Sequence, residues 1–323
     1  MSPSTTVGSQ ALTLQSIACG AGRFSVVVVS DEYGRLSAAC GEDASGHTVS
    51  VEDAFPIWSA TKMLTAATVL SLVDKGLVEL DDPVSAYLDF DIDEAITVRH
   101  LLSHKSGLAE GDPWSCDSDA TIEALAEIAA LGPVRDPGTP EYSTTGFMYA
   151  GLIIASATDM DPAAAFRKEV SQPLGMADTY FMATENGPTP RGGVYDDGDT
   201  CPGKTVTLGT GGDIVSTPAD LERFIVALFD GNLLSTEGLD TMIDTQSEVF
   251  GIPYGLGIAR IESSDGSDRS LFGHWGTTDS FEAGVFHDPN SHTTIVLILS
   301  GGEYLASLLD IATWADENTE REE

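Results

Sequence analysis

A serine and a lysine three residues apart, Ser59 and Lys62, are the residues whose types and spacing most clearly suit chemistry. Residues three apart share a helix face, so the ammonium group can reach the hydroxyl. A serine hydroxyl is a poor nucleophile until a base takes its proton, and a partly buried lysine with a lowered pKa can be that base. The pattern also recurs by chance, as a surface cap beside a solvated lysine, so it needs further support.

Two further motifs supply that support. Tyr142-Ser143-Thr144 comes just before an expected helix, and His274-Trp275-Gly276 lies at the end of an expected strand. With Ser59 and Lys62 they make the chain resemble the serine β-lactamases and penicillin-binding proteins. The resemblance is strongest to the class C-like branch, with its esterases, D-amino-acid peptidases and DD-carboxypeptidases. It runs from about residue 20 to 315 and includes weaker matches at 80–84, 96–108, 173–176, 211–221 and 254–257.

The resemblance implies a role for each motif residue. Ser59 would be the acylated nucleophile, Lys62 its activating partner, and Tyr142 the general acid/base with a phenol pKa lowered by the lysine. Whether Lys62 or Tyr142 takes the first proton stays open, because the two would act as a coupled unit. The backbone N–H groups of Ser59 and Thr277 would form the oxyanion hole, and the substrate would bind along Thr144, His274, Trp275 and Gly276.

Two departures from the family pattern bear on the substrate. Thr144 stands where the family usually has Asn, so a short hydroxyl replaces an amide that orients the substrate. His274 stands where true β-lactamases often carry Lys. A lysine presents a positive charge to a substrate carboxylate, whereas a histidine that is neutral at pH 7 presents little charge. These departures argue against efficient capture of anionic β-lactams and favour a neutral ester or amide. Trp275 would either narrow the cleft or simply pack.

The predicted function is therefore a serine hydrolase that cleaves a carboxylic ester or amide through a covalent acyl-enzyme. Three alternatives stay open: a D-amino-acid peptidase or DD-carboxypeptidase, a biosynthetic acyltransferase, and a non-catalytic binding protein of the same fold. Thr144 keeps the last alternative open because it leaves the second motif incomplete. We expect no cofactor and no metal, since His100 and His104 have helical spacing but lack the glutamate of a zinc protease motif.

The composition excludes some partners. The 323 residues include 51 acidic and 15 basic side chains, for a formal net charge of −36. Such a chain lacks the basic face that nucleic acids and anionic membranes require. The excess of acid fits either an ordinary acidic protein or adaptation to molar salt, and we favour the halophilic interpretation. A small ester, amide or peptide is the expected partner, and the sequence leaves the oligomeric state open.

The cellular location and the state of the cysteines are predicted from targeting and metal-binding patterns, none of which is visible in the sequence. No apolar run approaches the roughly 20 residues of a membrane span, and no signal peptide is visible. We therefore expect a cytoplasmic protein, although a chain whose leader had been removed would look the same. The four cysteines show no metal-binding spacing, so buried or free thiols are expected, with a Cys116–Cys201 bridge as the alternative.

Strand patterns lie at both ends of the chain and helical patterns in the middle. This order predicts an α+β fold of the β-lactamase/transpeptidase type, with an antiparallel sheet built from both termini. The expected sheet lobe is 1–58 with 205–323, the mainly helical lobe is 59–204, and the active site lies between them. Expected strands are 23–30, 35–40, 255–262, 269–274, 282–287 and 293–300; expected helices are 59–76, 83–88, 98–102, 119–131, 147–158, 218–229 and 303–314.

Overall fold

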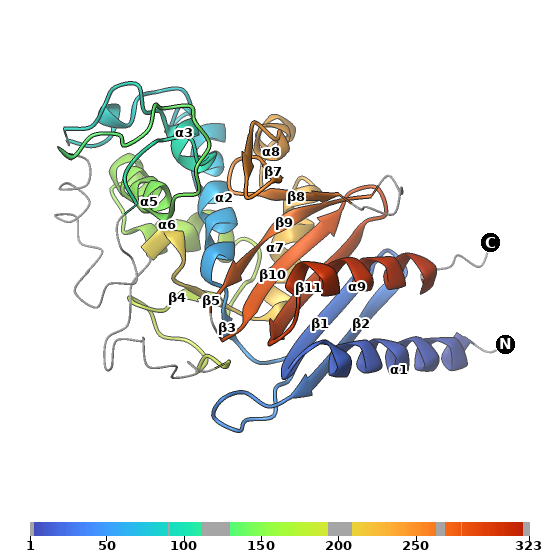
Figure 1. The fold of residues 1–323 in the computed structure, drawn as a ribbon. Helices are drawn as coiled ribbons and strands as arrows, with labels where there is room; N and C mark the ends of the chain where they lie inside the picture. Colours follow the sequence, from blue (N-terminus) through green and yellow to red (C-terminus); the bar gives the residue numbers. More distant parts are fainter. Residues whose placement is uncertain are drawn as a thin grey trace.

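A large antiparallel sheet forms the centre of the molecule (Figure 1). The computed structural model describes residues 3–89, 91–110, 130–192, 209–262, 269–278 and 280–318. Eight strands follow the order β2-β1-β11-β10-β9-β8-β7-β6, so strands from the two ends of the chain are neighbours, one strand in from the β2 edge. The strands are β1 Phe24–Asp31, β2 Gly34–Gly41, β6 Ser247–Val249, β7 Ile252–Tyr254, β8 Ala259–Glu262, β9 Ser270–Thr277, β10 Glu282–Asp288 and β11 Thr293–Ser300.

The pairing of β1 with β11 joins the two termini. Val26 lies opposite Ile298 and Val28 opposite Val296, in antiparallel register. These strands are apolar on both faces because helices cover both faces of the sheet. The α+β class and the sheet built from both termini are confirmed.

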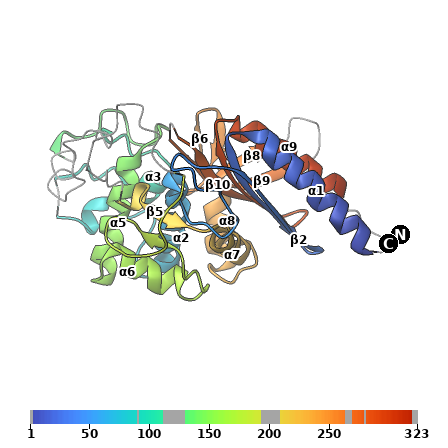
Figure 2. The ribbon, with the colours of Figure 1, turned by 90° about the horizontal axis from the view of Figure 1, so that it is seen from below.

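One face of the sheet is covered by α1 Pro3–Ala21 and α9 Tyr304–Asn318, which run side by side (Figures 1 and 2). Leu14 and Ala18 of α1 and Ile311 of α9 are buried in the same apolar cluster. The other face packs on α7 Pro218–Phe229 and on the central helix α2 Thr61–Asp74.

The remaining helices lie mostly around α2. They are α3 Val98–Leu102, α5 Thr144–Thr158, α6 Pro162–Phe166 and α8 Thr236–Ile243, with short helical segments η1 Trp58–Ala60, η2 Val84–Ala86, η3 Arg167–Ser171 and η4 Gly209–Gly211. A small second sheet has the order β3-β5-β4, built from β3 Phe55–Pro56, β5 Ile214–Ser216 and β4 Tyr180–Phe181. Among the described residues, no helix is long and apolar enough to cross a membrane.

The structure corrects two expectations about the N-terminal region. The helix α1 was not expected from the sequence, and it covers the edge of the sheet beside β2. Cys19 of α1 and Cys40 of β2 form a disulfide, so the expectation of free or merely buried thiols is wrong for this pair. Two further predictions, the Cys116–Cys201 bridge and most of the helix at 119–131, lie outside the described residues.

Candidate active site

Ser59 lies in a tight turn at the entrance to the central helix. The turn η1 precedes α2 directly, and Trp58 adopts φ 46°, a left-handed conformation that is unusual for a bulky residue. The N–H of Ile57 donates to the carbonyl of Ile214 at 2.9 Å, which ties the turn to the small sheet. Ser59 is therefore held at the N-terminal end of α2, half-buried, with its side chain lining a cavity.

Gly276 lets the strand β9 approach this turn. A Cβ atom at this position would lie 2.5 Å from the Ser59 nitrogen and 2.3 Å from the Ile57 oxygen. No side chain fits at such distances, so the glycine of the third motif is a steric requirement. The next residue, Thr277, lines the same cavity as Ser59. The pairing of the Ser59 and Thr277 N–H groups as an oxyanion hole stays a prediction.

Lys62 is completely buried one turn after Ser59. Its ammonium group donates to Ser59 Oγ at 3.1 Å, to Thr144 Oγ1 at 3.3 Å and to the Gly211 carbonyl at 2.7 Å. Burial lowers the lysine pKa to about 7, and the nearby Glu110 carboxylate opposes that shift only in part. A lowered pKa of this kind is the condition under which a lysine could act as the base for Ser59.

Tyr142 behaves differently from its expected role in one respect. Its side chain hydrogen-bonds Ser59, and its ring centroid lies 4.9 Å from Lys62 Nζ. Burial raises the pKa of the phenol, and the Glu110 charge raises it further, although the bond to Ser59 opposes the shift. The expected lowering of the Tyr142 pKa by the lysine is therefore wrong, because desolvation of the phenolate is the largest effect on this group and it raises the pKa.

Thr144, which stands in the usual asparagine position of the second motif, contacts the buried lysine. The residue is buried in the first turn of α5, and its hydroxyl accepts the hydrogen bond from Lys62. Ser143 caps the same helix, since its Oγ accepts the Gly146 N–H at 3.0 Å. The threonine hydroxyl thus contacts the lysine directly.

Glu110 was not anticipated from the sequence. Its carboxylate accepts the Thr144 N–H at 2.7 Å and the Ser143 hydroxyl at 2.8 Å, at the positive end of α5. It also lines the cavity that contains Ser59 and remains exposed to solvent. A negative charge therefore lies at the mouth of the site.

His274 does not offer a charge to a substrate. It is buried, its Nε2 lies 2.9 Å from the Tyr254 hydroxyl, and its Nδ1 lies 2.7 Å from the Trp275 carbonyl. Burial lowers the histidine pKa to about 3, and repulsion from Lys62 adds to the shift. The prediction of a neutral histidine is confirmed. Trp275 both packs, stacked on Tyr304, and lines the cavity.

His104 is a second residue that the sequence did not single out for this site. Its Nδ1 accepts the Ser143 N–H at 3.0 Å, and its ring lies 4.4 Å from the Tyr142 ring and 4.7 Å from the Tyr254 ring, between centroids. Burial lowers its pKa well below the usual value, so the ring is neutral. His104 therefore packs against the Tyr142 ring and accepts a hydrogen bond from the backbone of the next residue, Ser143.

The cavity has a volume of about 380 Å³ and brings most of the predicted site residues together. Lys62 lies beneath its floor, and Gly276 belongs to the strand at its side. Among the described residues, no group of three His, Cys, Asp or Glu could hold a metal ion. The lining residues are Ser59, Glu110, Tyr142, Thr144, Val249, Phe250, Ile252, Tyr254, Ala259, His274, Trp275 and Thr277.

Comparison with known proteins identifies the family of the chain. The family model named Beta-lactamase matches residues 21–316 of the chain. The chain belongs to the beta-lactamase family. This membership confirms the resemblance to serine β-lactamases and penicillin-binding proteins that the three motifs indicate.

Relatives within the family act on different bonds. The D-alanyl-D-alanine-carboxypeptidase/endopeptidase AmpH of Escherichia coli (strain K12) is 26% identical over 234 residues, which cover 62% of this chain and 55% of AmpH. Esterase EstB of Burkholderia gladioli is 27% identical over 176 residues, which cover 47% of this chain and 44% of EstB. The chain spans about half the length of the curated relatives it matches.

A solved structure matches over nearly the whole length. The D-amino acid amidase of Ochrobactrum anthropi SV3, in complex with L-phenylalanine amide, is 25% identical with a TM-score of 0.81. The match covers 96% of this chain and 97% of the amidase. It agrees with the β-lactamase/transpeptidase-like fold.

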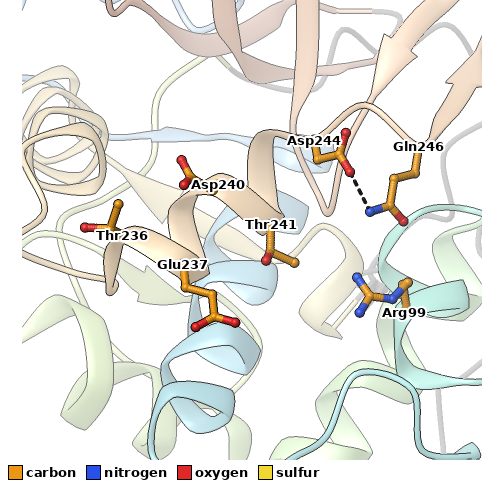
Figure 3. Close-up of a pocket in the computed structure, with 7 residues that line it drawn as sticks. All are labelled: Arg99, Thr236, Glu237, Asp240, Thr241, Asp244 and Gln246. Carbon is orange, nitrogen blue, oxygen red and sulfur yellow. Dashed lines mark hydrogen bonds between the residues drawn. The ribbon is translucent and has the colours of Figure 1, made fainter.

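A second, larger cavity of about 620 Å³ lies outside this site (Figure 3). It lies along α8, and Arg99 of α3 faces it from the other side. Its lining residues are Arg99, Thr236, Glu237, Asp240, Thr241, Asp244 and Gln246.

Proposed function

We propose that the protein is a serine hydrolase that cleaves an amide or ester bond through a covalent acyl-enzyme on Ser59. The observation that carries this proposal is the contact of Lys62 Nζ with Ser59 Oγ at 3.1 Å, together with a lysine pKa near 7. A buried amine of this kind is neutral in about half of the molecules at pH 7 and can accept the serine proton. We place the site between a sheet lobe, 1–58 with 205–323, and a helical lobe, 59–204.

The two shifted pKa values support one division of the roles that the sequence left open between Lys62 and Tyr142. Neutral Lys62 takes the Ser59 proton as Oγ attacks the carbonyl carbon of the substrate. Tyr142, whose raised pKa keeps the phenol protonated, donates its proton to the leaving nitrogen or oxygen. The phenolate then recovers a proton from Lys62, which returns the lysine to its neutral form. The bond to the leaving group breaks, and the acyl group remains esterified to Ser59.

Hydrolysis of the ester restores the enzyme. Water attacks the acyl carbonyl and gives its proton to Lys62, while Ser59 Oγ leaves and is protonated through Tyr142. In both steps the carbonyl oxygen becomes negative and is held by the N–H groups of Ser59 and Thr277.

The charges around the cavity favour a substrate with a positive group. Glu110 offers a carboxylate at the mouth, and the buried, neutral His274 offers no counter-charge for an anion. A net charge of −36 also repels anionic substrates over longer distances. We therefore propose amides or esters of amino acids, whose α-ammonium group would lie near Glu110. The similarity to a D-amino acid amidase supports this substrate class.

The test measures acylation and turnover together. Wild type and Ser59→Ala are exposed to both enantiomers of phenylalanine amide, to a p-nitrophenyl ester and to a penicillin. Intact-protein mass spectrometry reports the adduct, and released ammonia or p-nitrophenol reports turnover. Glu110→Gln is run beside them as the variant that removes the charge and keeps the shape.

We expect turnover of the amide and the ester by wild type and none by Ser59→Ala. Glu110→Gln should raise KM for the amino-acid amide more than for the uncharged ester. A wild type that neither turns over nor is acylated by any of these compounds would contradict the proposal.

A further inference from the structure

Phe250 lies at the tip of the hairpin formed by β6 and β7. Val249 pairs with Ile252, so the hairpin has a two-residue loop of Phe250 and Gly251. Both loop residues have positive φ, 55° and 78°. This is the pattern of a type I′ turn, in which Asn-Gly is the preferred sequence.

A phenylalanine in this place is costly in two ways. A bulky side chain disfavours the left-handed conformation, so phenylalanine destabilises this turn relative to asparagine or glycine. The side chain is also 81% exposed to water, so its partial burial stabilises the folded protein only slightly. Neither the local fold nor the core explains why an aromatic ring stands here.

The contacts of the ring point toward the catalytic centre. Its centroid lies 5.4 Å from that of Tyr142, the proposed proton donor. It lines the cavity of Ser59 together with Ile252 and Trp275, both only partly buried. The exposed ring therefore extends an apolar wall at the side of the reacting group.

We propose that Phe250 is a specificity-determining residue that binds a bulky apolar group of the substrate beside the scissile bond. This inference rests on the proposed function and names the shape of the substrate. An apolar group laid on the Phe250 ring would remove water from both surfaces, which supplies the stabilisation that the free protein lacks. The group belongs either to the acyl part of the substrate or to its leaving group, since both lie close to Tyr142.

The experiment replaces Phe250 by the residue that the turn prefers. Phe250→Asn removes the ring and suits the positive φ, so the melting temperature should stay equal or rise. Leu12→Asn serves as the control, because it removes an apolar side chain that is 74% exposed on α1, far along the chain from the cavity. Two substrate pairs are compared by kcat/KM: phenylalanine amide against alanine amide, and alanine p-nitroanilide against alanine amide.

We expect Phe250→Asn to lower the preference for the larger member of one pair by about tenfold or more, as the loss of an aromatic contact predicts. The first pair assigns the ring to the acyl group and the second to the leaving group. Leu12→Asn should keep both ratios of the wild type.

Two results would overturn the inference. Unchanged ratios in both pairs, with Ser59-dependent turnover intact, would show that Phe250 does not discriminate between substrates. A clear fall in melting temperature would show that the ring supports the fold instead. Absence of Ser59-dependent turnover in the wild type would overturn the proposed function and this inference together. Turnover with unchanged substrate ratios would overturn this inference alone.

Discussion

The two cavities differ most in the partners of the cationic side chain at each one. In the larger cavity, Arg99 makes two hydrogen bonds to Asp81, at 2.7 and 2.9 Å, in an exposed ion pair. In the smaller cavity, Lys62 is fully buried, and its three hydrogen-bond partners are uncharged oxygens. The first cation is satisfied, whereas the second is held near its point of deprotonation.

This difference shows that size is a poor guide to chemistry here. The 620 Å³ cavity offers carboxylates and hydroxyls to water, while the 380 Å³ cavity contains a serine in contact with a buried lysine of lowered pKa. Burial without a matching opposite charge lowers a lysine pKa and makes the amine reactive. The predictions that follow separate the two cavities experimentally.

The sharpest separation comes from one substitution in each cavity. Lys62→Ala should lower kcat at least about a hundredfold, because it removes the base for Ser59. Glu237→Gln, in the larger cavity, should stay within about twofold of the wild type. Steady-state rates with a p-nitrophenyl ester check both. A Lys62→Ala enzyme with near-normal turnover would remove the distinction between the cavities.

The pH dependence should follow the buried lysine. Below its pKa of about 7, Lys62 is protonated and cannot accept the serine proton. The kcat/KM for an uncharged ester should therefore rise about tenfold per pH unit up to about 7 and then level off. A profile that is flat from pH 5 to 9 would mean that Lys62 does not titrate in the rate-determining step.

His104 should act as a positioning residue with a smaller effect. His104→Ala leaves the Ser143 N–H without its acceptor and removes the ring beneath Tyr142, so kcat should fall about tenfold with little change in KM. His104→Asn restores an acceptor near the same position and should recover part of the loss. If both variants lose activity only in proportion to lost folded protein, measured by circular dichroism, the role is purely structural.

Salt should affect the protein surface and leave the buried lysine almost unchanged. Molar KCl shortens the screening length to about 3 Å, which relieves repulsion among the exposed acids. The melting temperature should rise by about 5 °C or more between 0.1 and 2 M KCl, while the midpoint of the pH profile shifts little. A protein most stable in dilute buffer would contradict the halophilic interpretation.

The motifs and the ends of the fold could be predicted because their patterns are local. The helix at 218–229 and the strand at 293–300 have the bounds that periodicity and capping indicate. The pairing of Ser59 with Lys62 follows from helical spacing alone. The helix α1 was missed because, among its residues 10–21, only Leu14 and Ala18 are fully buried, which leaves a weak pattern in a stretch rich in Thr, Ser and Gly.

The rest of the site depends on contacts that no local pattern reveals. Glu110 reaches α5 across 33 residues, and His104 reaches Ser143 across 39. The direction of the Tyr142 pKa depends on how strongly the surrounding protein desolvates the phenol, which spacing does not encode. Phe250 could have been noticed as a bulky residue before a glycine between two short strands.

The antiparallel packing of α1 and α9 has a practical consequence for engineering. Gln10 of α1 donates to the Asn318 carbonyl at the end of α9, and Figures 1 and 2 show the outer ends of both helices on the same side of the molecule. A short linker could therefore join the ends of α1 and α9, and the chain could be reopened at an exposed turn such as Glu32–Tyr33. Such a circular permutant would keep every strand neighbour of the sheet while changing which segment leaves the ribosome first.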